Sequence, residues 1–401
     1  MLFAFLILLS SSSPFIASTA IEHVVIFGID GLAIPPLLEL LQTSKQLPSF
    51  ERIISEGAYT FQARSVQPAI SYPNWYSIFT ATDPAFHGIH TNEYQPSRPQ
   101  VMPISGACTP MPTLFTVLRS HRPRCTMGAF YEWNTIGDML NMRPDLNVSQ
   151  WFPTDDGSVD AAVTFLKQHR PLVTLVYLDD VDETGHRVGF GEAYTEAILQ
   201  ADQRIGHVWQ TLDDLNMLDR TLIAFVTDHG RKEPLGKYHG SFTQTEMNTF
   251  WALWGPGIRR GHELKTPVAN YDVSPSLLHA MGLPMPLQWR GRPVREAFEN
   301  QIVSVGMLPD PELAKDPNHY AGWLFEDATW NQTATYQQCM ASFQLQTEWL
   351  WGQWDNASFG VGVTVGVLAQ TGVTLFIWGL CCLCRRRRPR YAHVLKSNDL
   401  E

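Results

Sequence analysis

The run His23-Val-Val-Ile-Phe-Gly-Ile29, followed directly by Asp30-Gly31, decides the fold. Apolar, β-rich residues without strict alternation are typical of a strand that is buried on both faces of a sheet. A helical pattern follows at 36–43. A strand that leads into a helix is the repeating unit of an α/β fold with a mainly parallel sheet. We therefore expect Asp30 at the carboxyl end of a buried parallel strand.

Two later runs repeat this arrangement. Residues 172–178 and 221–227 are apolar and β-rich, and they end at Asp179-Asp180 and at Asp228-His229. Ligands of open α/β sheets bind beyond the carboxyl ends of the strands. Three strands that end in metal-type ligands therefore predict a site at this edge of the sheet. The same patterns predict further elements at 192–215 (helix), 249–254 (strand) and 273–281 (helix).

The charge of the chain argues against non-specific nucleic-acid binding. The formal net charge is −10. Residues 385–401 contain six basic and two acidic side chains, a balance of +4, so the rest of the chain carries −14. An acidic body repels a nucleic-acid backbone. A bound metal ion could still attract phosphate locally, because the ion dominates the nearby field.

Both ends of the chain indicate export and membrane attachment. Residues 2–9 are apolar, and a small-residue stretch follows as far as Ala20, which is typical of a secretory signal peptide. Residues 359–384 are apolar and uncharged, long enough for one transmembrane helix. The arginines at 385–388 mark the cytoplasmic side. We expect a single-pass type I protein of the cell membrane or an endomembrane, with its body extracellular or lumenal. A buried first strand and a buried core helix are the alternatives.

Secretion has consequences for cysteine and asparagine. Three cysteines would lie in an oxidising compartment, and we expect Cys108 to pair with Cys125 because they are close in sequence, leaving Cys339. Three glycosylation sequons are consistent with export, and they begin at Asn147, Asn331 and Asn356.

Four clusters of polar residues could carry chemistry. They are Asp30, the stretch Ser71-Tyr72-Pro73-Asn74-Trp75, the stretch Asp182 to His186, and Asp228-His229-Gly230 with His239 close behind. Aspartate and histidine are ligands that zinc accepts. Asp182 and His186 are four residues apart, so one helical turn could bring both to a single ion. Each cluster alone is weak evidence, but their order on a βα pattern is specific.

With these motifs in this order, the chain resembles the ectonucleotide pyrophosphatase/phosphodiesterase family of the alkaline phosphatase superfamily, over roughly 24–298. The family's first metal-binding Asp matches Asp30, its nucleophile followed by aromatic-Pro-Asn matches Ser71, and its phosphate-binding Asn matches Asn92. The other ligand motifs match Val181 to His186, with Val in place of Pro, Asp228 to Gly230, and His239 to Ser241. Ser71 stands where most relatives have Thr, and Arg231 stands where Met is usual.

The resemblance implies an alkaline phosphatase-like α/β/α sandwich with two Zn²⁺ ions. One ion would be held by Asp30, Asp228 and His229 and would touch Ser71. The other would be held by Asp182, His186 and His239. Ser71 would form a phosphoseryl intermediate, and Asn92 would hold a non-bridging oxygen. Tyr72 matches the position where relatives present an aromatic ring to a nucleobase, Trp133 could be the other face of that slot, and a core tyrosine is the alternative for Tyr72.

The predicted function is that of a zinc-dependent ecto-phosphodiesterase or nucleotide pyrophosphatase. A phosphomonoesterase, a lipid-headgroup phosphodiesterase or phosphotransferase, and a non-catalytic cell-surface receptor are the alternatives. The spacing of Gly362 and Gly366 would also allow two membrane helices to pack in a homodimer. The predicted parts are a signal peptide (1–20), a catalytic domain (21–300), a membrane-proximal stalk or cap (301–358), a transmembrane helix (359–384) and a basic cytoplasmic tail (385–401).

Overall fold

The computed structural model describes residues 21–43, 46–93, 111–142 and 145–299. The strands in these residues are β1 (His23–Ile29), β2 (Ala58–Arg64), β3 (Met127–Tyr131), β4 (Val148–Trp151), β5 (Val173–Leu178), β6 (Thr221–Thr227), β7 (Asn248–Trp254) and β8 (His262–Glu263). They form one mixed sheet in the order β4-β3-β5-β1-β6-β7-β2-β8. The neighbouring strands β4, β3, β5, β1 and β6 all run parallel to one another. Strand β7 pairs antiparallel with both β6 and β2, and β8 runs parallel to β2.

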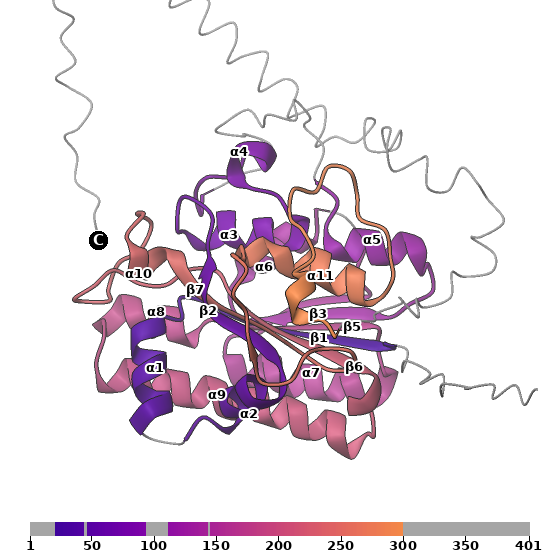
Figure 1. Ribbon diagram of the computed structural model, residues 1–401, viewed down its shortest axis with the longest axis horizontal. Coiled ribbons are helices and arrows are strands. Elements are labelled where there is room, and N and C mark those ends of the chain that lie inside the picture. The colour runs from indigo at the N-terminus through magenta and orange to yellow at the C-terminus, as the bar shows by residue number, and fades with distance from the viewer. Residues whose placement is uncertain (1–20, 44–45, 94–110, 143–144, 300–401) are drawn as a thin grey trace, which may run out of the picture. The chain divides into compact units, whose positions relative to one another are not determined.

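Helices cover both faces of this sheet (Figure 1). One layer consists of α3 (Ser71–Thr80), α5 (Leu114–His121), α6 (Asn134–Leu140) and α11 (Val273–Ala280). The other consists of α1 (Ile34–Thr43), α2 (Pro48–Glu56), α7 (Asp155–His169) and α9 (Glu192–Asp214). The shorter helices are α4 (Pro84–His87), α8 (Asp180–Val188) and α10 (Gln244–Met247), with 3₁₀ turns η1 (Leu218–Arg220), η2 (Asn270–Asp272) and η3 (Arg295–Ala297).

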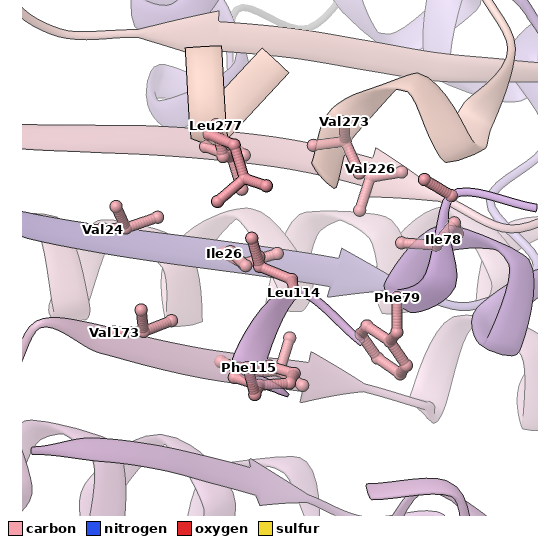
Figure 2. Packing of buried hydrophobic residues seen from close by; sticks show 14 of the residues in the cluster. Val24, Ile26, Ile78, Phe79, Leu114, Phe115, Val173, Val226, Val273 and Leu277 are labelled. Atoms are coloured by element: carbon pink, nitrogen blue, oxygen red, sulfur yellow. The ribbon is translucent and has the colours of Figure 1, made fainter. Parts of the chain in front are cut away.

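The two layers bury both faces of the central strands, which explains why the β1 sequence does not alternate. Val24 and Ile26 belong to one apolar cluster, together with Phe79 and Phe115 from its helices (Figure 2). The intervening Phe27 belongs to the cluster on the opposite face. Full burial of each such side chain contributes about 1.5–3 kcal/mol. A polar residue on either face of β1 would therefore be costly.

The prediction of an α/β sandwich with a mostly parallel sheet is confirmed. The expected strands at 172–178 and 221–227 are β5 and β6, and the expected helices at 192–215 and 273–281 are α9 and α11. The strand expected at 249–254 is β7, which joins the sheet antiparallel.

Several predictions concern parts of the chain outside the described residues. These are the signal peptide at 1–20, the stalk at 301–358, the membrane helix at 359–384 and the tail at 385–401, together with Cys108, Cys339, Asn331 and Asn356. They stay predictions, as does the Cys108–Cys125 pair. In the described part of the chain, no helix combines the length and the apolar character that crossing a membrane requires.

Candidate active site

The three central strands bring the predicted ligands to one edge of the sheet. Strands β1, β5 and β6 are paired so that Ile29 lies beside both Leu178 and Thr227. Asp30 is the next residue after β1, and Asp228 is the next residue after β6. Helix α8 begins two residues after β5 and carries the remaining acidic ligand. The register of the parallel ladder therefore determines how close these side chains lie.

Two groups of three residues could each hold a metal ion. In each group, one potential ligand atom per residue lies within 4.8 Å of the others. The first group is fully buried and consists of Asp30, Asp228 and His229. The second consists of Asp182, His186 and His239.

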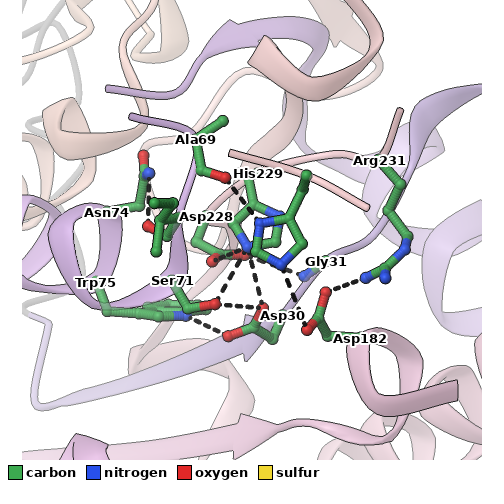
Figure 3. A network of polar contacts seen from close by, with 12 residues as sticks. Asp30, Gly31, Ala69, Ser71, Asn74, Trp75, Asp182, Asp228, His229 and Arg231 are labelled. Atoms are coloured by element: carbon green, nitrogen blue, oxygen red, sulfur yellow. Dashed lines mark hydrogen bonds and ion pairs between the residues drawn. The ribbon is translucent and has the colours of Figure 1, made fainter. Parts of the chain in front are cut away.

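The second group is built by one turn of α8 and by the loop that follows β6. Asp182 Oδ2 lies 3.0 Å from His186 Nε2, one helical turn further along α8, and 4.0 Å from His239 Nε2. The two groups adjoin each other, because the His229 and His239 rings stack with centroids 3.8 Å apart. All six predicted ligands therefore gather in one place. Figure 3 shows four of them, Asp30, Asp182, Asp228 and His229, beside Ser71 at the start of α3.

Ser71 is the first residue of α3, and its hydroxyl faces the first group. Its Oγ lies 3.4 Å from Asp30 Oδ1 and 3.1 Å from His229 Nε2. Asn74, one turn later, fixes the chain that leads to Ser71, since its Nδ2 donates to the carbonyls of Pro68 and Ile70 at 3.0 and 2.9 Å. The Asn of the Tyr-Pro-Asn stretch thus shapes the turn before the helix and does not enter the site.

Each oxygen of Asp30 has a different partner. Oδ2 accepts hydrogen bonds from Trp75 Nε1 at 2.7 Å and from the Tyr177 hydroxyl at 2.5 Å. Oδ1 faces Ser71 and His229. Gly28 makes room for this arrangement, because a Cβ there would lie 2.6 Å from the Trp75 ring. The two donors orient the carboxylate so that Oδ1 is directed toward the centre.

The two oxygens of Asp228 also have different partners, and so do those of Asp182. Asp228 Oδ1 accepts the backbone N–H of Gly31 at 3.0 Å, and its Oδ2 lies 3.1 Å from His229 Nε2. Asp182 Oδ1 pairs with the guanidinium of Arg231, and its Oδ2 faces the two histidines of its group. Each aspartate therefore presents one oxygen to the centre and anchors the other to the protein.

Two of the histidines are held in the form that binds metals. His229 Nδ1 lies 3.0 Å from the carbonyl of Gly230, and His239 Nδ1 lies 2.8 Å from the carbonyl of Ala69. A carbonyl can only accept, so each Nδ1 carries the proton and each Nε2 keeps its lone pair. Burial lowers the pKa of both imidazoles, that of His229 well below its usual range. Both rings are neutral at pH 7.

The electrostatics of the first group call for a cation. Burial, together with the neighbouring Asp228 and Asp182, raises the pKa of Asp30 well above its usual range. Burial and the charge of Asp182 also raise the pKa of Asp228 well above its usual range. Asp228 Oδ2 is fully buried, yet within the described residues it receives no hydrogen bond of good geometry. A buried carboxylate oxygen without a donor is costly, and a metal ion would satisfy it.

Asp182 behaves differently from the other two aspartates. Burial alone would raise its pKa, but the hydrogen bond from His186 and the charge of Arg231 hold the pKa of Asp182 below its usual value. The carboxylate is therefore ionised at neutral pH. Carboxylate oxygens and imidazole nitrogens are donors that zinc accepts, so the two groups fit divalent metal ions of this kind.

A family model described as type I phosphodiesterase/nucleotide pyrophosphatase matches residues 24–241, more than half of the chain. This chain belongs to that family. The ectonucleotide pyrophosphatase/phosphodiesterase family member 1 of Mus musculus is 25% identical over 260 residues, a match that covers 59% of this chain and 27% of that protein. The chain thus spans little more than a quarter of the length of this curated relative.

Solved structures show the same fold at lower identity. Murine ectonucleotide pyrophosphatase/phosphodiesterase 5 has 14% identity and a TM-score of 0.53, with 69% of this chain and 100% of that chain covered. A 2-O GAG sulfatase has 15% identity and a TM-score of 0.55, with 69% and 74% covered. These likenesses support the alkaline phosphatase-like fold of the family.

Of the predicted substrate-binding residues, Asn92 and Trp133 both contact Tyr72, the residue that follows Ser71. Asn92 Oδ1 accepts the backbone N–H of Tyr72 at 2.9 Å. The Tyr72 ring is only 1% exposed and meets the Trp133 ring edge to face, with centroids 6.5 Å apart. The two rings do not form a parallel slot, because the first turn of α3 packs Tyr72 into the apolar cluster of its layer. Tyr72 has the position of a core tyrosine here, while Trp133 is partly exposed.

Sequence reasoning missed the role of the residues that support the predicted ligands, although Trp75 stood in one of the predicted clusters. Trp75 lies one helical turn after Ser71 and therefore on the same side of α3. Tyr177 is on β5 and pairs with Gly28, two residues before Asp30 on the neighbouring strand. The i, i+4 spacing from Ser71 is a signal that could have identified Trp75. Tyr177 could be found only after the strand register was known.

A third group of acidic residues is already paired with a positively charged side chain, that of Arg204. Glu132, Asp155 and Asp180 could meet at one ion. Arg204, however, pairs with Asp155 at 3.1 Å and with Asp180 at 2.5 Å, and its side chain is largely buried. The guanidinium therefore already provides the positive charge that two of these carboxylates need.

Proposed function

We propose that this chain is a zinc-dependent phosphodiesterase and nucleotide pyrophosphatase that acts on extracellular or lumenal nucleotides through a phosphoseryl intermediate. One observation carries the proposal: the Ser71 hydroxyl lies 3.1 Å from His229 Nε2 and 3.4 Å from Asp30 Oδ1, beside two adjoining ligand groups. Membership of the family of nucleotide pyrophosphatases and phosphodiesterases supports it.

Two Zn²⁺ ions would share six protein ligands. Asp30, Asp228 and His229 would hold the ion next to Ser71. Asp182, His186 and His239 would hold the other. When bound, such a pair of ions favours the ionised serine and stabilises charge on the entering and leaving oxygens.

Ser71 and Asn92 would act on the phosphate directly. Ser71 Oγ would release its proton to solvent and bond to phosphorus as the bond to the leaving-group oxygen breaks. Water would then attack phosphorus and break the Oγ–phosphorus bond, with one proton of the water restoring the hydroxyl and the phosphate product released. Ser71 begins a ten-residue helix, so the positive end of the helix dipole favours an anion at this position. The backbone N–H of Tyr72 holds Asn92 Oδ1, which leaves Asn92 Nδ2 to donate to a non-bridging oxygen.

Trp133 is our candidate for the contact with the nucleobase. It is partly exposed, lies at the start of α6, and is supported edge to face by Tyr72. Stacking of a base on an aromatic ring is worth about 1–3 kcal/mol. Tyr72 would then act by holding Trp133 in place.

A second candidate function is favoured by the loop that carries His239. Leu235, Tyr238 and Phe242 are 64%, 61% and 77% exposed, on both sides of this ligand. Apolar side chains at the edge of a site fit the apolar part of an amphiphilic substrate. A lipid-headgroup phosphodiesterase or phosphotransferase is therefore the alternative on the same core.

We also propose that the body faces the cell exterior or a lumen, with the predicted signal peptide at 1–20 and the predicted membrane helix at 359–384. The naming of the mouse relative as an ectoenzyme supports this orientation. The partners would be the membrane and a nucleotide or other phosphodiester. A homodimer through Gly362 and Gly366 would be compatible with it.

A substrate panel on the zinc-loaded full-length protein tests the function. A nucleotide diester, a nucleoside triphosphate, a phosphate monoester and a choline-type lysolipid would be compared. We expect the two nucleotides to be turned over fastest, and Ser71→Ala to lose at least about 10³-fold in kcat. Ser55→Ala is the matched control, because Ser55 is exposed on α2 and bonds only to carbonyls of its own helix.

The remaining outcomes separate the alternatives. Faster turnover of the lysolipid or of the monoester would replace the nucleotide proposal with that substrate class. Unchanged activity in Ser71→Ala would rule out the covalent route. A protein that binds no zinc and turns over nothing would be a receptor that reuses the fold.

A further inference from the structure

Arg231 is a buried arginine next to the first ligand group. It follows the Asp228-His229-Gly230 motif directly, and its side chain has no exposed surface. The guanidinium donates to three acceptors (Figure 3 shows the first). They are Asp182 Oδ1 and the backbone carbonyls of Gly236 and Lys237. Each of the guanidinium's three nitrogens therefore donates to a different acceptor.

Two glycines provide the space for this arrangement. A Cβ at Gly185 of α8 would lie 2.3 Å from Arg231 Nε and 2.4 Å from its Cζ. Gly31 has a positive φ of 61°, and a Cβ there would lie 2.0 Å from Asp182 Oδ1. The pair of Arg231 and Asp182 thus fills a space that any larger residue at either glycine would occupy.

Arg231 connects the two chain segments that supply the second ligand group. Asp182 belongs to α8, whereas His239 lies in the loop after β6, two residues beyond Lys237. One planar guanidinium bonds to the carboxylate on the first segment and to two carbonyls on the second. A planar fork with fixed donor directions suits this task, and a flexible ammonium does not.

We propose that Arg231 is a positioning residue for the metal position formed by Asp182, His186 and His239, and that it has no such role for the other position. It holds Asp182 Oδ1, so that Oδ2 remains directed toward the two histidines, and it holds the loop that carries His239. This inference rests on the proposed binding of two zinc ions.

The positive charge of the guanidinium should weaken metal binding, whereas the positioning role should strengthen it. A purely electrostatic role would make Arg231 repel the ion, so that its removal would tighten binding. A positioning role predicts weaker binding after removal, because Asp182 Oδ1 would lose its donor and the carboxylate could turn. Loss of a group that orients a metal ligand typically costs about 10–100-fold in metal affinity. The sign of the change therefore distinguishes the two roles.

The test is a zinc titration of the full-length protein against a competing chelator, with elemental analysis of the bound metal. We expect Arg231→Met to bind one ion as wild type does and the other about 10–100-fold more weakly. Arg231→Lys should recover part of this loss. Gly185→Ala keeps the charge of Arg231 but displaces its guanidinium, so it should lower the affinity for the same ion. Arg187→Met is the matched control, since Arg187 is exposed on the same helix.

The same substitution made in a His186→Ala variant identifies the ion whose affinity depends on Arg231. His186→Ala removes one ligand of the second position, so the ion that remains is the one near Ser71. Arg231→Met should then change the affinity for that ion by no more than about two-fold. Thermal unfolding in excess chelator checks that each variant folds, and if Arg231→Met does not, Gly185→Ala and Arg231→Lys decide.

Three results would overturn the proposal. They are unchanged or tighter binding of the second ion in the arginine and glycine variants, equal weakening of both ions, and a loss in the His186→Ala background as large as in wild type. Wild-type protein that binds no zinc would instead overturn the proposed function, and this inference with it.

Discussion

Replacing Tyr177 by Phe tests how the site keeps Asp30 ionised when metal is bound. The Tyr177 hydroxyl lies 2.5 Å from Asp30 Oδ2 and 2.8 Å from Asp179 Oδ1. One hydroxyl proton cannot serve both acceptors. Burial, with the charge of Asp182 adding to it, raises the pKa of Asp179 to about 8. At pH 7 Asp179 is therefore protonated and donates to Tyr177, which donates to Asp30.

The expected magnitude follows from the two states of Asp30. Without metal, burial and the charges of Asp228 and Asp182 raise the pKa of Asp30 and so favour its protonated form. In that form the hydrogen bond lost in Tyr177→Phe is a neutral one, worth about 0.5–1.5 kcal/mol. With metal bound Asp30 is ionised, and the lost bond is worth about 1.5–3 kcal/mol. The difference of about 1–1.5 kcal/mol corresponds to about 5–13-fold weaker binding of the ion beside Ser71.

Calorimetric zinc titration at pH 7 measures this change. Tyr131→Phe is the matched control, because Tyr131 is a buried tyrosine of the same sheet whose hydroxyl contacts Ser149, away from the ligands. Asp179→Asn keeps a neutral donor and should bind zinc nearly as wild type does. Above pH 8 wild type should weaken relative to Asp179→Asn, since ionised Asp179 then competes for the Tyr177 proton. Equal affinity in Tyr177→Phe and wild type would refute the reasoning.

Two further predictions concern metal and pH. Removal of metal by a chelator should abolish turnover and zinc should restore it, whereas a chelator-resistant enzyme would contradict the ligand assignment. Burial, with the charge of His90 adding to it, lowers the pKa of His87 to about 3. Unfolding exposes an imidazole with a pKa near 6.5, so this stability is complete above pH 6.5 and is lost as pH falls toward 3, about 2 kcal/mol by pH 5. Denaturant titrations at pH 7 and pH 5 should show a smaller change in His87→Gln, and equal changes in both proteins would exclude His87 as the cause.

The elements that sequence analysis predicted well are those whose patterns are strong by themselves. Strands β1, β5 and β6 are buried on both faces and appear as unbroken apolar runs, and α9 keeps its periodicity over 23 residues. Strand β2 is half-exposed and changes register between Thr60 and Ala63, while β8 has only two residues. Such strands are defined by their neighbours, so their own residues carry little signal.

The candidate site shows the same division. Asp30, Asp228 and His229 could be singled out because they end apolar runs, and the order of the motifs pointed to a common site. The burial of Tyr72 depends on how the α3 layer packs, which no local pattern reports. Arg231 was visible as a departure from the family, but its contact with Asp182 depends on the space left by Gly185.

The backbone N–H of Asp30 bonds to the carbonyl of Leu178 at 3.0 Å and so extends the ladder between β1 and β5. The first ligand is therefore a continuation of the most protected part of the molecule. Breathing motions of surface loops would leave its position unchanged, and its amide should exchange with solvent as slowly as those of the central strands. Catalytic precision and global stability would then have one origin, and substitutions that loosen the middle of the sheet would reduce both together.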